Sequence, residues 1–268
     1  MNGIIAAIDL GSSSPRVLYH AAGFARLLSC GLRVLHVNGA SVQSRARVRE
    51  YCRQQMAYEV DVEDEDIVVR SGLVSDAIVR EAIREQARMI VVGSSARGGL
   101  GKLMLGSTSD AVLRSATVPV LVVPPAEFDI VDISDRPALT SGPILAAVDL
   151  DDGCDRHLQF AAELSRLSRQ HLDLLTVARQ RVNDQVAAEK LRERAHSLEP
   201  RPHALIVRRG DVGTEISRCA VSEGAGLVVL GVRPRSRGNP GAIASAILKS
   251  RRAFVLTIPG RSVEQLSA

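Results

Sequence analysis

The chain has 268 residues, which suggests roughly two domains at ~150 residues each, and its hydrophobic content of 46% is enough to build sizeable cores. A net charge of +4 and an aromatic content of 3% without tryptophan disfavour specific nucleic-acid binding, which relies on basic patches and stacking platforms. The four cysteines form no CxxC pair, which argues against a zinc or thioredoxin-like site and suits the reducing cytoplasm. We expect no signal peptide and no membrane span, because no apolar run approaches ~20 residues.

Apolar runs alternate with helical patterns through the first half. Strands are predicted at Gly3–Ile8, Leu32–Val37, Ile67–Val69, Met89–Val92 and Val118–Val123. A helix is predicted from Ser14-Pro15 to Cys30-Gly31 and another over Val74–Arg88. The arginines at 45, 47, 49 and 53 suit a solvated helix face, and the acidic run Glu59–Asp66 suits a solvated loop or strand edge. This alternation predicts βαβ units and a parallel sheet with helices on both faces.

A small-residue loop follows the fourth predicted strand. It begins at Gly93, and Gly106-Ser107-Thr108 then opens a helical pattern. Glycines let a backbone approach an anion, and the N–H groups at a helix start point at it. The alternative interpretation as a P-loop over residues 96–103 is disfavoured, because Leu103 stands where that motif needs a hydroxyl for magnesium.

The second half repeats the first. Ile144–Asp149 repeats Ile4–Asp9 at an offset of 140 residues, and Gly231 repeats Gly93 at an offset of 138. Between the halves lies a proline-rich stretch, which we interpret as a linker over residues 127–141. So long a period indicates domain duplication, with domains at 1–126 and 142–268.

The loop also carries a family motif. Gly93-x2-Ala96-x9-Gly106-Ser107 resembles the Gly-x2-Gly-x9-Gly-Ser/Thr pattern of the universal stress protein family, with one glycine replaced by Ala96. Because it carries both this motif and the repeat, the chain resembles a tandem universal stress protein. The resemblance implies two Rossmann-like or flavodoxin-like α/β domains, each with a mostly five-stranded parallel sheet and helices on both faces. It also implies that the strands at 118–123 and 254–258 pair with each other as an internal pseudo-dimer, with a homodimer of chains left open.

By the same resemblance, the first half holds an adenine nucleotide. Asp9 would contact the adenosine and the backbone at Val37 the adenine. Gly93, Ala96, Gly106, Ser107 and Thr108 would line the ribose and phosphates, and Arg97 and Lys102 would either screen phosphate charge or remain solvated loop residues. The expected ligand is ATP, with ADP or AMP and accompanying magnesium left open. The methyl group of Ala96 is the departure that puts this binding in question.

The second half departs further from the motif. It reads Gly231-x2-Pro234-x9-Ala244-Ser245, so two glycines are lost, and its spacing predicts a final helix about one turn shorter than in the first half. We therefore expect a degenerate site there. Six basic residues also gather in this region, and they form either an anion or nucleic-acid patch or a solvated loop and helix end: Arg233, Arg235, Arg237, Lys249, Arg251 and Arg252.

The function implied is a cytoplasmic stress-response regulator that binds ATP and signals through its conformation or through an unidentified protein partner. The alternative is a structural or interaction member of the family that binds no nucleotide. We expect no enzyme, because no general base or magnesium carboxylate is placed, although slow ATP hydrolysis or autophosphorylation stays open. A related nucleotide hydrolase is disfavoured because its loop motifs are missing.

Overall fold

The computed structural model of the chain describes residues 2–38, 41–55, 62–94, 105–125, 128–133, 137–140, 142–151, 155–178, 182–232 and 240–260. The strands are β1 (Ile4–Ile8), β2 (Leu32–Val37), β3 (Ile67–Arg70), β4 (Met89–Gly93), β5 (Val120–Val123), β6 (Val131–Asp132), β7 (Ala138–Leu139), β8 (Ile144–Val148), β9 (Leu172–Ala178), β10 (Ala204–Arg209), β11 (Leu227–Val232) and β12 (Phe254–Pro259). The helices are α1 (Ser14–Leu27), α2 (Val42–Gln54), α3 (Val74–Arg84), α4 (Ser107–Ser115), α5 (Arg156–Ser168), α6 (Asp184–His196), α7 (Val212–Ser222) and α8 (Pro240–Leu248), with one 3-10 turn, η2 (Asp64–Asp66).

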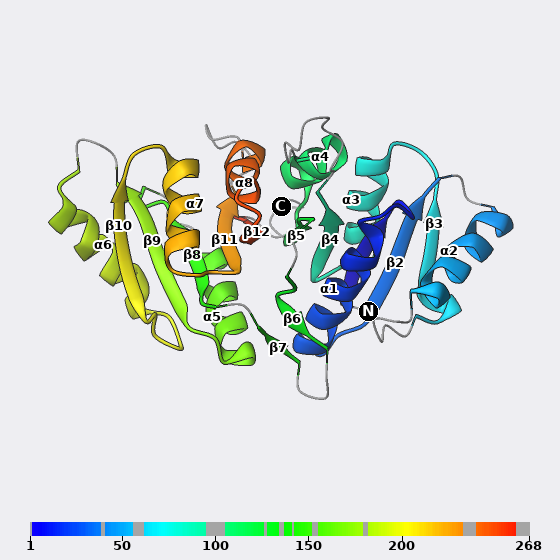
Figure 1. Cartoon of the computed structure of the whole chain (residues 1–268), viewed down its shortest axis with the longest axis horizontal. Coiled ribbons are helices and arrows are strands. Elements are labelled where there is room, and N and C mark those ends of the chain that lie inside the picture. Colours follow the sequence, from blue (N-terminus) through cyan, green and yellow to red (C-terminus); the bar gives the residue numbers. More distant parts are fainter. Residues whose placement is uncertain are drawn as a thin grey trace.

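One ten-stranded sheet runs through both halves of the chain (Figure 1). Its strand order is β10-β9-β8-β11-β12-β5-β4-β1-β2-β3. Every pair within a half is parallel, and only the central pair, β12 with β5, is antiparallel. Each half therefore has the Rossmann-like arrangement in which the first strand lies in the middle and the chain builds outward on both sides of it. The predicted α/β class is confirmed.

The repeat in the sequence is also a repeat in burial. β1 and β8 share the same burial pattern, in which four of the five residues are buried. Such continuous apolar runs are expected where both faces of a parallel sheet are covered by helices. Alternate residues of β1 then enter opposite layers: Ile4 and Ile8 pack in one core, and Ile5 packs in the other.

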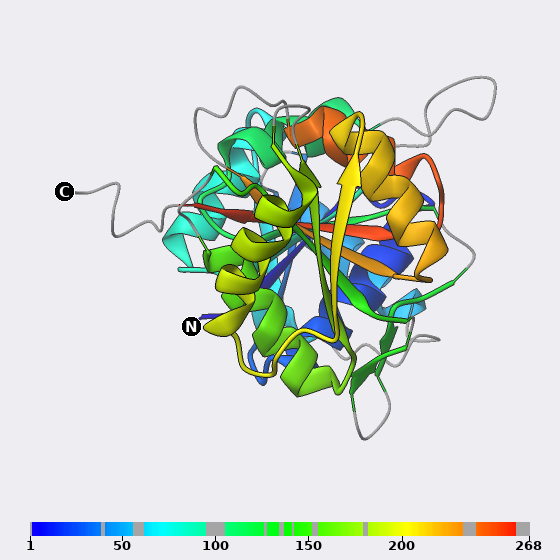
Figure 2. The same ribbon diagram turned by 90° about the vertical axis from the view of Figure 1, so that its left-hand side faces the viewer.

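Two helical layers cover the sheet. One core joins residues of α1, α2, α5 and α6, and the other joins residues of α3, α4, α7 and α8. Figure 2 shows α6 and α7 on opposite sides of β10. Both cores are continuous from the first half to the second, so the two halves share their apolar layers instead of each closing its own.

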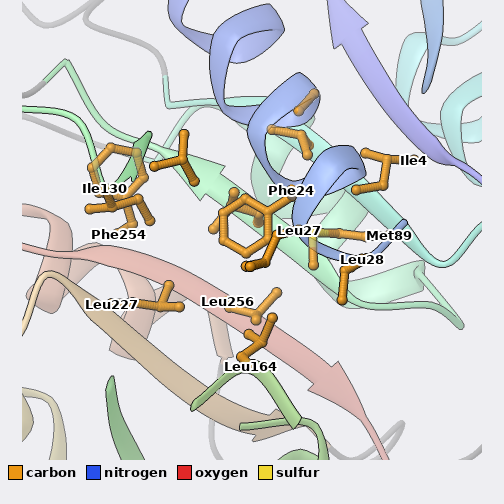
Figure 3. Packing of buried hydrophobic residues seen from close by; sticks show 14 of the residues in the cluster. Ile4, Phe24, Leu27, Leu28, Met89, Ile130, Leu164, Leu227, Phe254 and Leu256 are labelled. Carbon is orange, nitrogen blue, oxygen red and sulfur yellow. The ribbon is translucent and has the colours of Figure 1, made fainter. Parts of the chain in front are cut away.

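The junction between the halves is buried. The antiparallel pairing aligns Val255 with Val122 and Thr257 with Val120, and all four residues are buried. Beneath it, Phe24 of α1 points towards Leu256 of β12 (Figure 3). The predicted pairing of the final strands is thus present, and it leaves the sheet no free edge at its centre.

The described residues of the linker, 128–133 and 137–140, form a clamp. β6 and β7 pair antiparallel, and Val131 packs so closely on α1 that a Cβ on Gly23 would lie 2.6 Å from its Cγ2. Arg16 pairs with Asp129 at 2.9 Å, while Phe128 packs edge-on against Phe254 with ring centroids 5.7 Å apart. The linker therefore fastens the first half to the second.

His20 lies under this clamp and is fully buried. Its Nδ1 lies 2.7 Å from the carbonyl of Arg16 and its Nε2 lies 3.3 Å from the N–H of Ile130. One ring nitrogen therefore donates and the other accepts, which requires the neutral imidazole. His20 is therefore part of the packing and hydrogen bonding that hold this clamp.

Two helices end earlier than the sequence predicted. α1 stops at Leu27 and not at Cys30, and α3 stops at Arg84 and not at Arg88. In each case a non-glycine residue adopts positive φ just after the end, Ser29 at 50° and Gln86 at 49°. A hydrogen bond from the following N–H back to the helix then closes the turn, as from Ala87 to Ala82 at 2.8 Å. Because the left-handed residues are not glycines, no composition signal marks these ends.

Among the described residues, no helix is long and apolar enough to cross a membrane.

Candidate functional site

The candidate site lies where the strand order of the first half reverses. β1 lies between β2, the next strand along the chain, and β4, which arrives from the other side. Their carboxyl ends meet at one edge of the sheet, and loops leaving such a switch point diverge and open a crevice. Five of the six predicted site positions within the described residues follow β1, end β4 or open α4.

Asp9 leaves β1 and organises the turn into α1. Its Oδ1 accepts a hydrogen bond from the N–H of Gly11 at 2.8 Å and another from Oγ of Ser14 at 3.0 Å. The residue is exposed, so the carboxylate remains accessible at the sheet edge. Pro15 in the first turn starts α1, and no side chain among the described residues caps this helix.

Gly93 ends β4 between the starts of two helices. A Cβ at this position would lie 3.0 Å from Oγ of Ser13, just before α1, and 3.4 Å from Cγ2 of Val17. Its carbonyl accepts a hydrogen bond of 2.6 Å from Oγ of Ser109 in the first turn of α4. Two helix N-termini therefore converge on the same strand end.

The N-terminus of α4 has no side-chain cap among the described residues. Gly106 is its N-cap, with φ −65° and ψ 153°. Ser107 is exposed and Thr108 is half-buried. The first N–H groups of a helix carry partial positive charge and lack partners within the helix, so this end favours an anion. Because the backbone of Gly106 is extended and its φ is negative, glycine is not needed there for a left-handed turn. Its missing side chain instead leaves room for a ligand to approach the backbone.

Val37 lies one strand further out, at the end of β2. It is half-buried and packs against the α3–α4 side of the sheet. Its neighbour His36 is buried and donates from Nδ1 to the carbonyl of Ile8 at 2.9 Å, which ties the ends of β1 and β2 together. The backbone at Val37 therefore sits beside the Asp9 turn, on the side away from Gly93.

The remaining predicted positions, Ala96 and Arg97, lie outside the described residues, as does Lys102. The structure brings Asp9, Gly93, Gly106, Ser107 and Thr108 to one edge of the sheet around the starts of α1 and α4. Among the residues that it describes, no group of three potential ligands is placed to hold a metal ion.

Sequence reasoning missed the residues that support this site. Ser109 ties α4 to β4, and Tyr51 of α2 donates from its hydroxyl to the carbonyl of Gly11 at 3.0 Å. Ser109 could have been suspected from its place in the first helical turn. No sequence signal points to Tyr51, because its partner lies 40 residues away.

The corresponding edge of the second half is built differently. Asp149 keeps its local role and accepts from the N–H of Asp151 at 3.1 Å. Gly231, however, faces a buried histidine: a Cβ there would lie 2.8 Å from Nδ1 of His157, whose Nε2 donates to the carbonyl of Ala147 at 3.1 Å. Gly231 thus makes room for an imidazole where Gly93 faces Ser13 and Val17.

The prediction of a shorter final helix is wrong. α8 begins at Pro240 and matches α4 in length at nine residues each. The difference lies in the preceding connection, which spans residues 233–239 in the second half and 94–106 in the first. Ser245 consequently lies in the middle of α8, where its carbonyl accepts from the N–H of Lys249 at 3.1 Å, and it cannot open the helix as Ser107 does.

Comparison with known proteins gives the family. The model of the universal stress protein family matches residues 1–124 and 141–251. A universal stress protein of Thermus aquaticus is 35% identical over 83 residues, which cover 31% of this chain and 61% of that protein. The universal stress protein A homolog 1 of Coxiella burnetii is 32% identical over 136 residues, covering 45% of this chain and 94% of its own. The chain thus spans less than two thirds of the Thermus protein.

Solved structures agree on the fold. A universal stress protein from Archaeoglobus fulgidus matches with a TM-score of 0.73 and 19% identity, covering 97% of this chain and 98% of its own. A universal stress protein solved in complex with cAMP matches 46% of this chain and 95% of its own, with a TM-score of 0.37 and 25% identity. One from Archaeoglobus fulgidus in complex with dAMP matches 44% of this chain and 97% of its own, with a TM-score of 0.36 and 24% identity. The bound cAMP and dAMP are properties of those two proteins. With both halves matched by the family model and a whole-chain fold in common with a solved member, this chain belongs to the universal stress protein family.

Proposed function

We propose that the chain is a regulator that binds one adenine nucleotide, ATP, in its first half. The observation that carries this proposal is the convergence of the starts of α1 and α4 on Gly93 at the β1–β4 switch point. A helix start favours phosphate oxygens, and a glycine at the strand end leaves room for the ligand to approach the backbone.

The described residues fit the parts of a nucleotide. The uncapped N–H groups at Ser107 and Thr108 are suited to phosphate oxygens, and the exposed carboxylate of Asp9 is suited to hydroxyl or amine donors of an adenosine. The backbone at Val37 is close enough to this turn to line the base. These roles agree with those that the family motif implies.

We propose binding without rapid turnover. Oδ1 of Asp9 already accepts two hydrogen bonds from its own turn, so the geometry favours a holding role over that of a general base. Magnesium would arrive with the triphosphate, since this cation usually relies on phosphates and water for most of its ligands.

The readout we propose is conformational. α4 packs against α8 across the junction, so a ligand held at the start of α4 is linked directly to the second half. Through this contact the nucleotide would alter a surface offered to a protein partner or to a second copy of the chain. A cytoplasmic setting is proposed because Cys30, Cys52 and Cys219 are free thiols.

The proposal is tested by equilibrium dialysis with labelled ATP and magnesium. Gly106→Val should abolish retention of ATP, because its branched side chain occupies the approach to the start of α4. Ser115→Ala, at the other end of the same helix, should bind as the original chain does. If the original chain retains no ATP, the alternative is favoured: a family member that works through its surfaces alone, as the rebuilt second half already suggests.

A further inference from the structure

The turn that carries Asp9 is held from a distance by α2. This helix is mostly solvated, and its firm attachments are Val48 and Cys52, which are buried, and Tyr51, which is half-buried. The hydroxyl of Tyr51 donates to the carbonyl of Gly11 at 3.0 Å, across 40 residues of sequence. Tyr51 therefore anchors an otherwise local turn to a second element.

Both backbone groups of Gly11 are hydrogen-bonded, and they belong to two successive peptide units. Its N–H donates to Oδ1 of Asp9 at 2.8 Å, and its carbonyl accepts from Tyr51 and, at 3.1 Å, from the N–H of Ser14. The same Oδ1 accepts from Ser14 at 3.0 Å. Because the two peptide units meet at the Cα of Gly11, the direction of the Asp9 carboxylate depends on where Gly11 is held.

The second half contains an analogous anchor with different chemistry. There Nη1 of Arg194 in α6 donates to Oδ1 of Asp155 at 2.6 Å, and Asp155 is the N-cap of α5. In both halves the helix after the second strand therefore holds the turn after the first strand. In the first half the anchor reaches Gly11, the residue whose N–H orients the strand-end aspartate, whereas Arg194 bonds the N-cap of α5 directly.

We propose that Tyr51 is a positioning residue for nucleotide binding, acting through Gly11 on the carboxylate of Asp9. The inference rests on the proposed function of the first half. Removing the hydroxyl leaves the carbonyl of Gly11 bonded to the N–H of Ser14 within its own turn and removes the bond that ties this turn to α2, while the ring keeps its packing. A lost hydrogen bond of ordinary strength that is expressed in binding lowers affinity about three- to tenfold.

The test compares Tyr51→Phe with Tyr19→Phe. Tyr19 in α1 makes the same kind of bond, from its hydroxyl to the carbonyl of Val131 at 3.2 Å, but at the linker and away from the site. Two quantities are measured: the Kd for ATP by calorimetry, and hydrogen exchange of the Gly11 amide without nucleotide. Tyr51→Phe should raise the Kd about three- to tenfold and speed exchange at Gly11, and Tyr19→Phe should change neither.

The outcomes separate the two proposals. If the original chain binds no ATP, the proposed function fails and this inference fails with it. If the original chain binds ATP but Tyr51→Phe leaves either the Kd or the exchange of Gly11 unchanged, or if Tyr19→Phe has the same effects, the positioning role of Tyr51 alone is overturned.

Discussion

Acidification should weaken the clamp between the two halves through one buried histidine. His20 is fully buried, and this burial lowers its pKa to about 3. The hydrogen bond to the carbonyl of Arg16 opposes that shift and the charge of Arg16 adds to it, while Asp129 lies 3.6 Å from Nε2. Protonation would also replace the acceptor that Nε2 offers to the N–H of Ile130.

The direction of the pH dependence follows from the pKa of His20 in the unfolded and the folded chain. The unfolded chain takes up this proton near pH 6.5, whereas the folded chain resists it until about pH 3. The unfolded state therefore binds more protons between these values, and stability falls as the pH falls through that window. From pH 8 to pH 5 the loss through His20 alone is about 2 kcal/mol.

Urea denaturation at the two pH values measures this directly. The free energy of unfolding of the original chain should fall by about 2 kcal/mol more than that of His20→Gln, which keeps a donor and an acceptor but does not titrate. Tyr19→Phe weakens the same clamp without removing a titrating group, so it should retain the full pH dependence. Equal losses in the original chain and His20→Gln would show that His20 does not cause the pH dependence.

Three further predictions concern stability, each read from urea denaturation. Gly142→Ala should destabilise the fold by roughly 2 kcal/mol or more, because φ is 64° and a Cβ would lie 2.0 Å from the carbonyl oxygen of Gly224. Gly224→Ala, where φ is 67° but the space is open, should destabilise it by only about 1 kcal/mol. Equal losses in the two variants would argue against the clash at Gly142. Asn183→Ala should cost about 1 kcal/mol by removing the cap of α6, and Asn183→Asp should not. Phe254→Ala should cost about 3 to 5 kcal/mol in a single transition; two separate transitions would contradict a shared core.

Regular elements were predictable where burial repeats. The offset of 140 residues identified β1 and β8 before any coordinates, because a strand covered on both faces must be apolar along its length. The same logic placed Asp9 and Gly93 at one sheet edge, since parallel strands bring their carboxyl ends together. Strand ends were thus the best predicted part of the candidate site.

The predictions of helix boundaries were wrong for identifiable physical reasons. Gln86 occupies the left-handed position that Gly224 occupies in the second half, so the residue that would have marked the end of α3 was missing. For α8, the motif drew attention to Ser245, although Pro240 is the better start signal because its fixed φ suits the first helical turn.

The supporting contacts could not be predicted from the sequence. The linker looked like a polar spacer because its proline and aspartate content says nothing about a partner such as Arg16 more than one hundred residues away. Tyr51 likewise reads as an ordinary aromatic on a charged helix. Its role emerges only when the fold brings α2 beside the turn at Gly11.

We propose that one half of this duplicated chain binds a nucleotide and that the other half does not. Calorimetric titration of the full chain with ATP and magnesium measures the number of sites per chain. We expect one site, which disappears in Gly106→Val. Two sites, or a single site that survives that substitution, would contradict it.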